Sequence, residues 1–321
     1  MRQLACMVLA VLAGFLQPAL VLADYPEKPL RMIVPFPPGG ATDVLSRLTA
    51  EQLGARLGQP VVIENKPGMG GNLGAEIASR AAPDGYTLLM GPASIYAISA
   101  TLYSKLNYRL EDLAPVSLVA NAPHVLLVNR DVPATTVTEL IALAKSKPGE
   151  LNIASHGSGS VSHLEAALFD RMAGTQILHV PYKGSGPALL DLVGGRVQVM
   201  FDSIAASLPH VRGGRLRALA VTGTSRSPLL PDVPTLDESA LKGYSAHSWL
   251  GIFVPAKTPE PIINRLQRAI AQTIADPATN QKFVAAGFEP RSSTPQEFAA
   301  FIRQEVVKWA PIVKYSGATA D

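Results

Sequence analysis

Residues 30–48 constrain the fold more than any other stretch, because they combine a strand, a glycine turn and a helix. Residues 30–34 (LRMIV) are a short apolar run, too brief for a helix. Pro35 ends the run, since proline cannot donate to a sheet ladder. Gly39 and Gly40 allow backbone angles that a side chain would forbid. After Thr42 or Asp43, either of which suits an N-cap, apolar residues recur at helical spacing. The stretch predicts one strand–turn–helix unit of an α/β sheet.

The turn of this unit has two interpretations. Unpaired amide hydrogens and the positive end of a helix dipole favour an anion above the sheet. An ordinary tight turn of an α/β domain would have the same sequence. The turn lacks the spaced lysine of a phosphate loop and the G-x-G-x-x-G order of a dinucleotide site. The residues alone therefore leave both interpretations open.

The start of the chain has the three parts of a secretory signal peptide. Arg2 supplies a positive charge, residues 4–22 carry no charge, and the small residue Ala23 precedes Asp24. An uncleaved membrane anchor is the alternative, since the stretch is near spanning length. We expect export and removal of residues 1–23. The only cysteine, Cys6, would be removed with them, so the mature chain would have no disulfide or thiol chemistry.

Composition narrows the range of partners. The formal net charge is +3, of which Arg2 carries one. There is no basic run, and aromatic residues make up 6% of the chain, so we expect no nucleic acid partner. With 47% hydrophobic residues, the remaining length suffices for roughly two domains.

Strands and helices alternate in two series, one before about residue 120 and one after it. The first series has strands at 30–34, 61–64 and 86–90, and the second at 151–154, 177–182, 197–201 and 216–221. Such alternation indicates doubly wound, mostly parallel sheets with flanking helices. A strand at 249–255 and helices near 258–275 and 294–315 follow. Two α/β lobes would leave a cleft between them, which is a favoured place for a small ligand.

Several loops that end strands carry residues suited to binding a carboxylate. Residues 155–160 are dense in serine and glycine, and they precede a predicted helix. Helix capping with a solvated loop is the alternative for these serines. Ser94, Tyr182 and Asp202 follow other strands and belong on the same rim if the strands are parallel. Asp202 would either accept a hydrogen bond from a ligand ammonium or hydroxyl group, or cap a helix that begins near Ser203.

Catalytic and metal motifs are missing from the sequence. No G-x-S-x-G elbow can be written around Ser158, Ser160 or Ser185. There is no H-E-x-x-H motif or cysteine set. We therefore expect no catalytic residues, no metal and no cofactor.

Eight ordered motifs resemble one family of bacterial receptors. They are PFPPGGATD (35–43), NKPGMGGN (65–72), PDGYTLL (83–89), HVPYKG (179–184), VMFD (199–202), GRLRALAV (214–221), PDVPT (231–235) and WLGIFVPA (249–256). Together they resemble the substrate-binding receptor of the tripartite tricarboxylate transporters, the Bug-type family, over essentially all of residues 24–321.

The resemblance implies a two-lobed periplasmic binding protein of type II-like architecture, with the ligand cleft between its lobes. Residues 24–122 and 247–321 would form the first lobe and residues 123–246 the second. The chain would cross between them near residues 121–124 and 244–248. In this family the turn after the first strand and the serine–glycine loop of the second lobe hold the ligand carboxylate, often through ordered water. The expected ligand-binding residues are Phe36, Pro38, Gly39, Gly40, Ala41, Thr42, Asp43, Ser94, Ser155, His156, Gly157, Ser158, Gly159, Ser160, Tyr182 and Asp202.

The resemblance also implies the partners. The ligand would be a small carboxylate, namely a di- or tricarboxylate, an amino acid or an aromatic acid. A monomeric periplasmic receptor would deliver it to membrane permease subunits. Two alternatives remain open from the sequence: a periplasmic enzyme acting on a carboxylic acid, and a receptor that signals to a membrane sensor protein.

Overall fold

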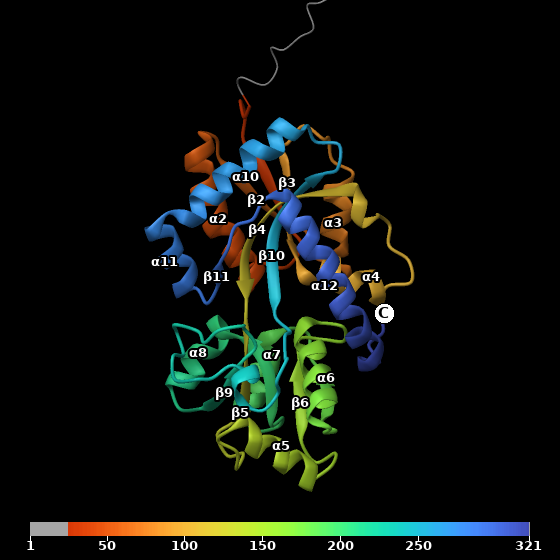
Figure 1. Ribbon diagram of the computed structural model, residues 1–321, viewed down its shortest axis with the longest axis vertical. Helices are drawn as coiled ribbons and strands as arrows, with labels where there is room; N and C mark the ends of the chain where they lie inside the picture. Colours follow the sequence, from red (N-terminus) through yellow and green to blue (C-terminus); the bar gives the residue numbers. More distant parts are fainter. Residues whose placement is uncertain (1–24, 321) are drawn as a thin grey trace, which may run out of the picture.

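A computed structural model describes residues 25–320 as two β-sheets, each flanked by helices, stacked along the long axis of the molecule (Figure 1). The expected signal peptide, residues 1–23, lies outside the described residues. Within residues 25–320, no helix has the length and apolar character that a bilayer crossing requires.

The first sheet has six strands in the order β11-β4-β10-β3-β1-β2. Its strands are β1 (Leu30–Val34), β2 (Val61–Asn65), β3 (Thr87–Pro92), β4 (Leu113–Ala122), β10 (Ser248–Pro255) and β11 (Glu289–Pro290). β1 pairs in parallel with β2 and β3, whereas β10 runs antiparallel to both β3 and β4. β1 has the bounds that the apolar run predicts, and its last three residues are fully buried.

The second sheet has five strands in the order β7-β6-β8-β5-β9. Its strands are β5 (His124–Asn129), β6 (Asn152–Ser155), β7 (Leu178–Pro181), β8 (Val199–Ser203) and β9 (Leu216–Val221). β6 pairs in parallel with β7 and β8, but β5 runs antiparallel to β8 and β9. Both sheets are thus mixed rather than mostly parallel. In the first sheet β10 and β11 run against the other strands, and in the second sheet β5 does so.

Strand direction brings the ends of both series to the boundary between the sheets. Only Pro123 separates the end of β4 from the start of β5, so both lie at this boundary (Figure 1). β3 has the same direction as β4, because both are antiparallel to β10, and β1 and β2 follow β3. β8 is antiparallel to β5, and β6 and β7 follow β8. The loops that follow β1, β6, β7 and β8 therefore face the boundary.

Helices cover the faces of both sheets. They are α2 (Ala41–Leu57), α3 (Asn72–Ser79), α4 (Ser99–Leu102), α5 (Val137–Ser146), α6 (Val161–Ala173), α7 (Ser185–Val193), α8 (Ile204–Arg212), α9 (Leu236–Ser239), α10 (Glu260–Ala275), α11 (Pro277–Ala285) and α12 (Pro295–Ser316). The last helix begins with a capping box: the Glu297 amide donates to Thr294 and the Thr294 amide donates to Glu297. α4, α9 and α11 are short helices that the sequence analysis did not identify.

The N-cap predicted for α2 is wrong. Gly40 occupies the N-cap position, and Thr42 and Asp43 lie inside the first turn of the helix. Gly40 is extended and has no side chain with which to cap the helix amides. The Asp43 carboxylate instead bonds to Gly39 in the turn, to Arg47 one helical turn ahead and to Asn65 of β2.

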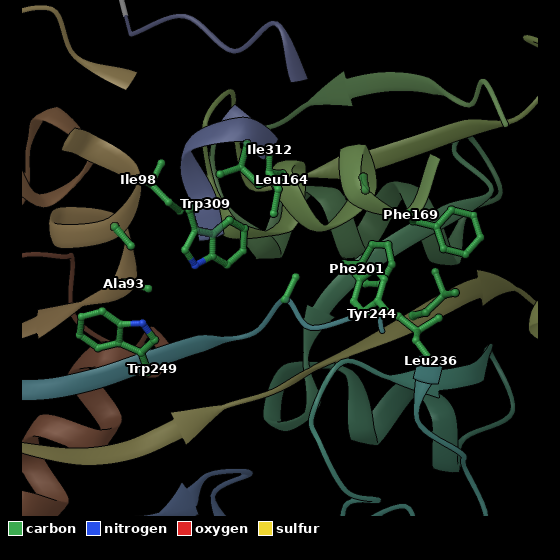
Figure 2. Packing of buried hydrophobic residues seen from close by; sticks show 14 of the residues in the cluster. Ala93, Ile98, Leu164, Phe169, Phe201, Leu236, Tyr244, Trp249, Trp309 and Ile312 are labelled. Carbon is green, nitrogen blue, oxygen red and sulfur yellow. The ribbon is translucent and has the colours of Figure 1, made fainter. Parts of the chain in front are cut away.

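One apolar cluster joins the two sheets. It contains Trp249 of β10 together with Phe201 of β8, and α12 connects them (Figure 2). Figure 2 shows Ile312 of α12 beside Leu164 of α6, two helices that are in contact. The last helix, α12, therefore packs both on the first sheet and on α6, a helix that flanks the second sheet.

Candidate functional site

Asp43 holds the turn after β1 in shape. Its carboxylate accepts hydrogen bonds from the Gly39 amide at 3.0 Å, from Arg47 at 2.9 and 3.1 Å, and from Asn65 Nδ2 at 2.9 Å. Burial alone would raise the pKa of Asp43, but these hydrogen bonds hold it below its usual value. The Asn65 amide also donates to the Phe36 carbonyl at 3.0 Å. β1, β2 and α2 are thus tied together at the turn.

The same turn presents amide hydrogens at the start of α2. Gly39 has φ +88°, which a side chain would strain, and no side chain caps the helix. Pro38, Gly39, Gly40 and Ala41 are exposed. Within residues 25–320, the Ala41 amide donates no hydrogen bond. Free amides at a helix N-terminus are suited to a carboxylate.

The loop between β6 and α6 is bonded largely within itself. The His156 amide donates to Ser162, the Gly157 amide to Ser155, and the hydroxyl of Ser160 to the Gly157 carbonyl, at 2.7–3.2 Å. Ser160 is also the N-cap of α6 and accepts from the His163 amide. Capping, the alternative weighed for these serines, thus accounts for Ser160.

Two stacked imidazoles hold this loop through hydrogen bonds. The rings of His163 and His179 lie 3.7 Å apart and are nearly parallel. His163 Nδ1 accepts from the Gly159 amide at 3.1 Å, and His179 Nε2 lies 2.6 Å from Ser155 Oγ. Burial and the neighbouring ring lower the pKa of His163 to about 4, and burial also lowers the pKa of His179, so both rings are uncharged at neutral pH.

The loop also touches the other lobe's elements. A Cβ at Gly159 would overlap Leu102 of α4, and Ser158 Oγ lies 3.4 Å from the Thr319 carbonyl. These contacts agree with the strand directions, since both place the loop at the boundary between the sheets.

Asp202 is fully buried at the end of β8 and bonded on both oxygens. Oδ1 accepts from His156 Nε2 at 2.9 Å and from the Ser203 amide at 2.7 Å. Oδ2 accepts from Ser185 Oγ at 2.8 Å and from Ser207 Oγ at 3.4 Å. Three loops, those after β6, β7 and β8, therefore converge on this carboxylate. The N-cap of α8 is Ser203, whose hydroxyl accepts from the Ala206 amide, and not Asp202.

A second buried pair lies beside the first. His124 Nδ1 is 2.6 Å from Glu165 Oε2, and the His124 ring meets the His156 ring edge-on at 5.7 Å. Burial alone would lower the pKa of His124, but the Glu165 carboxylate raises it. Burial raises the pKa of Glu165 itself. Tyr244 also reaches this pair, through a hydrogen bond to the Glu165 carbonyl at 3.1 Å.

The predicted site residues fall into two groups in the structure. Residues 36–43 surround the β1 turn, while His156 and Asp202 are joined at the ends of β6 and β8. No hydrogen bond within residues 25–320 joins one group to the other. Tyr182 donates to Asp191 at 2.8 Å, and the buried Ser94 hydroxyl has no partner among the described residues. Direct contact of any of these residues with a ligand stays a prediction.

Sequence reasoning missed residues that hold the site from outside its loops. They are Arg47, Asn65, His124, Glu165 and Ser207. Asn65 carried a usable signal, because it stands at the end of a strand next to the one before the turn. Glu165 had none, since its apolar helix predicts ordinary core packing.

Comparison with known proteins agrees with the motifs. The model of a family described as the tripartite tricarboxylate transporter family receptor matches residues 45–318. Protein BugT of Bordetella pertussis is 40% identical over 318 residues, which are 97% of this chain and 98% of BugT.

Solved structures match the fold. R. palustris Rpa4515 with adipate has a TM-score of 0.85 and 36% identity, over 92% of this chain and 99% of that one. MatC from Rhodopseudomonas palustris with bound malate has a TM-score of 0.79 and 34% identity, over 90% of this chain and 100% of that one. The α/β binding-protein fold expected from the sequence is confirmed.

Proposed function

The chain belongs to the family of tripartite tricarboxylate transporter receptors, and from this premise we propose that it binds a small carboxylate between two lobes. The lobes are residues 24–122 with 247–321, and residues 123–246. The observation that carries the proposal is that β1 of the first sheet and β6, β7 and β8 of the second all end at one boundary, so their following loops face each other across it.

The ligand carboxylate would sit at the start of α2. Gly40 and Ala41 are exposed there, and no side chain caps the helix. The contact would be made mostly by neutral donors. Each hydrogen bond to a charged group contributes about 1.5–3 kcal/mol, so three or four would outweigh the ordering costs without a salt bridge.

The second end of the ligand would face the loops of the other lobe. Two similar receptors hold dicarboxylates in their solved structures, namely Rpa4515 with adipate and MatC with malate. The dicarboxylates bound to these two receptors support a ligand of the same class for the present chain. The mature receptor would lie in the periplasm after removal of residues 1–23 and act as a monomer without catalytic turnover. It would deliver its ligand to membrane permease subunits.

A panel of ligands tests this function. Mono-, di- and tricarboxylates, amino acids and aromatic acids are screened for a saturable rise in melting temperature, and hits are measured by calorimetry. Sugars and inorganic phosphate serve as controls. We expect carboxylates to bind and to be recovered unchanged. Binding of sugars or phosphate alone would refute the proposal.

One substitution tests the place of the carboxylate. Ala41 is the first residue of α2, a position that favours proline, and the preceding Gly40 is extended, as a residue before proline should be. Ala41→Pro therefore removes one amide hydrogen and keeps the helix. We expect affinity to fall by about 1.5–3 kcal/mol, the range for a hydrogen bond to a charged group. The melting temperature of the free protein should not change, and equal affinity in both proteins would place the carboxylate elsewhere.

A further inference from the structure

Asp202 positions another residue rather than meeting a ligand itself. The residue is 0% exposed, and four protein groups already donate to its two oxygens. A carboxylate has about four acceptor sites, so these bonds fill it. Its partner His156 is different, because 23% of the His156 side chain is exposed.

The bond to Asp202 fixes which nitrogen of His156 carries the proton. Burial alone would raise the pKa of Asp202, but the His156 bond and the hydroxyl of Ser185 hold it below its usual value. The carboxylate is therefore ionised at neutral pH and can only accept. His156 Nε2, at 2.9 Å, must donate. In the neutral ring, Nδ1 is then a hydrogen-bond acceptor.

Nδ1 is available for a ligand. Within residues 25–320, no group donates a hydrogen bond to His156 Nδ1. The residue follows β6, at the boundary that the β1 turn also faces. A carboxylate offers only acceptors and would be repelled by a bare imidazole nitrogen. A hydroxyl or amino group offers the donor that this nitrogen needs.

Resting on the proposed carboxylate-binding function, we propose that His156 Nδ1 accepts a hydrogen bond from a hydroxyl or amino group on the ligand. The receptor thereby prefers hydroxy- or amino-substituted carboxylates to plain dicarboxylates of the same length. Asp202 is the positioning residue, and His156 determines the specificity.

Matched ligand pairs test the proposal on the wild-type protein. Calorimetry compares malate with succinate, and 2-hydroxyadipate with adipate, at pH 8. One neutral hydrogen bond corresponds to about 3- to 10-fold in affinity. We expect the hydroxylated member of the tighter-binding pair to bind with higher affinity by this factor at pH 8. Equal affinities at pH 8 would overturn the inference.

Two variants separate recognition from a merely structural role. His156→Gln keeps an amide donor for Asp202 and a carbonyl acceptor for the ligand, so it should retain the preference. The double variant His156→Leu/Asp202→Asn removes the acceptor without stranding a buried charge, and it should bind both members of a pair equally. A structural role predicts instead that both variants weaken the two ligands by the same factor.

The outcomes also distinguish this inference from the proposed function. If wild-type protein binds carboxylates but ignores the hydroxyl group, only the inference fails. If it binds no carboxylate, the proposed function fails, and the inference fails with it.

Discussion

Asp43 accepts hydrogen bonds from three directions: from Gly39 in the turn, from Arg47 one helical turn ahead and from Asn65 on β2. The residue is 3% exposed, so a substitution removes a buried carboxylate on which these donors converge. The shape of the turn after β1, and with it the proposed carboxylate contact, depends on this one side chain.

We predict that Asp43→Ala lowers the free energy of unfolding by about 1.5–3 kcal/mol, the range for hydrogen bonds to a charged group. Because the native pKa of Asp43 is lowered, its stabilisation is complete above the unfolded value of about 3.9 and is lost as the pH falls through the native value. Urea unfolding at pH 7 and below pH 4 measures both effects. Asp131→Ala, at a side chain that is 83% exposed, is the control and should change stability by less than about 0.5 kcal/mol. Similar losses for the two variants would show that Asp43 does not hold the turn.

Residues 42 and 43 also show why the N-cap of α2 could not be predicted from the sequence. Thr42 and Asp43 are both of the types that cap helices, and local preference selected them. The true cap is Gly40, because the Asp43 carboxylate is taken by Arg47 and Asn65. Asn65 lies 22 residues away, beyond the reach of any local rule. Likewise, the His156–Asp202 bond joins residues 46 apart.

Among the elements, α12 has the widest role, because it packs against both sheets' layers (Figure 2). Trp309 is fully buried and donates to Glu305 at 3.0 Å, and Trp249 of β10 donates to the same carboxylate oxygen at 3.0 Å. Farther along the helix, Ile312 is 5% exposed in the cluster that includes α6. One helix thus couples the two halves of the molecule.

We predict that Ile312→Ala lowers the free energy of unfolding by about 2–5 kcal/mol, since it opens a cavity where α12 meets α6. Val307→Ala is the matched control on the same helix, because Val307 is 74% exposed. Thermal and urea unfolding of the two variants are compared. A loss below 0.5 kcal/mol, about the size expected for an exposed site, would show that the contact between the helices contributes little.

Elements with a regular apolar period were predictable from sequence, whereas pairing direction was not. β1 and β9 have the bounds that their apolar runs predict, and α12 begins at its capping box. The alternation of strands and helices suggested parallel sheets, but β5 and β10 run antiparallel to their neighbours. Their direction follows from the passage of the chain between the sheets, which no periodicity records. The short helices α4 and α9, of four residues each, span too little chain to show a period.

At the scale of the whole molecule, the two halves are joined by few segments. The chain passes from β4 to β5 through Pro123, and it returns along residues 240–247 into β10 (Figure 1). α12 adds the contact with α6. Short connections of this kind allow hinge motion, and a rotation about them would bring the β1 turn and the loops after β6–β8 together.

We predict that saturation with a carboxylate ligand contracts the molecule by closing these halves on each other. The ligand favours the closed form because only there can both groups of loops contact it, and the shift equals its difference in affinity for the two forms. Small-angle scattering with and without ligand should show a smaller radius of gyration at saturation. A sugar that does not bind is the control and should leave the radius unchanged. Ile312→Ala should close as well, since it loosens the α12 contact without removing a loop. An unchanged radius at saturating ligand would mean that the ligand is held by one half alone, and the proposed site between the lobes would be wrong.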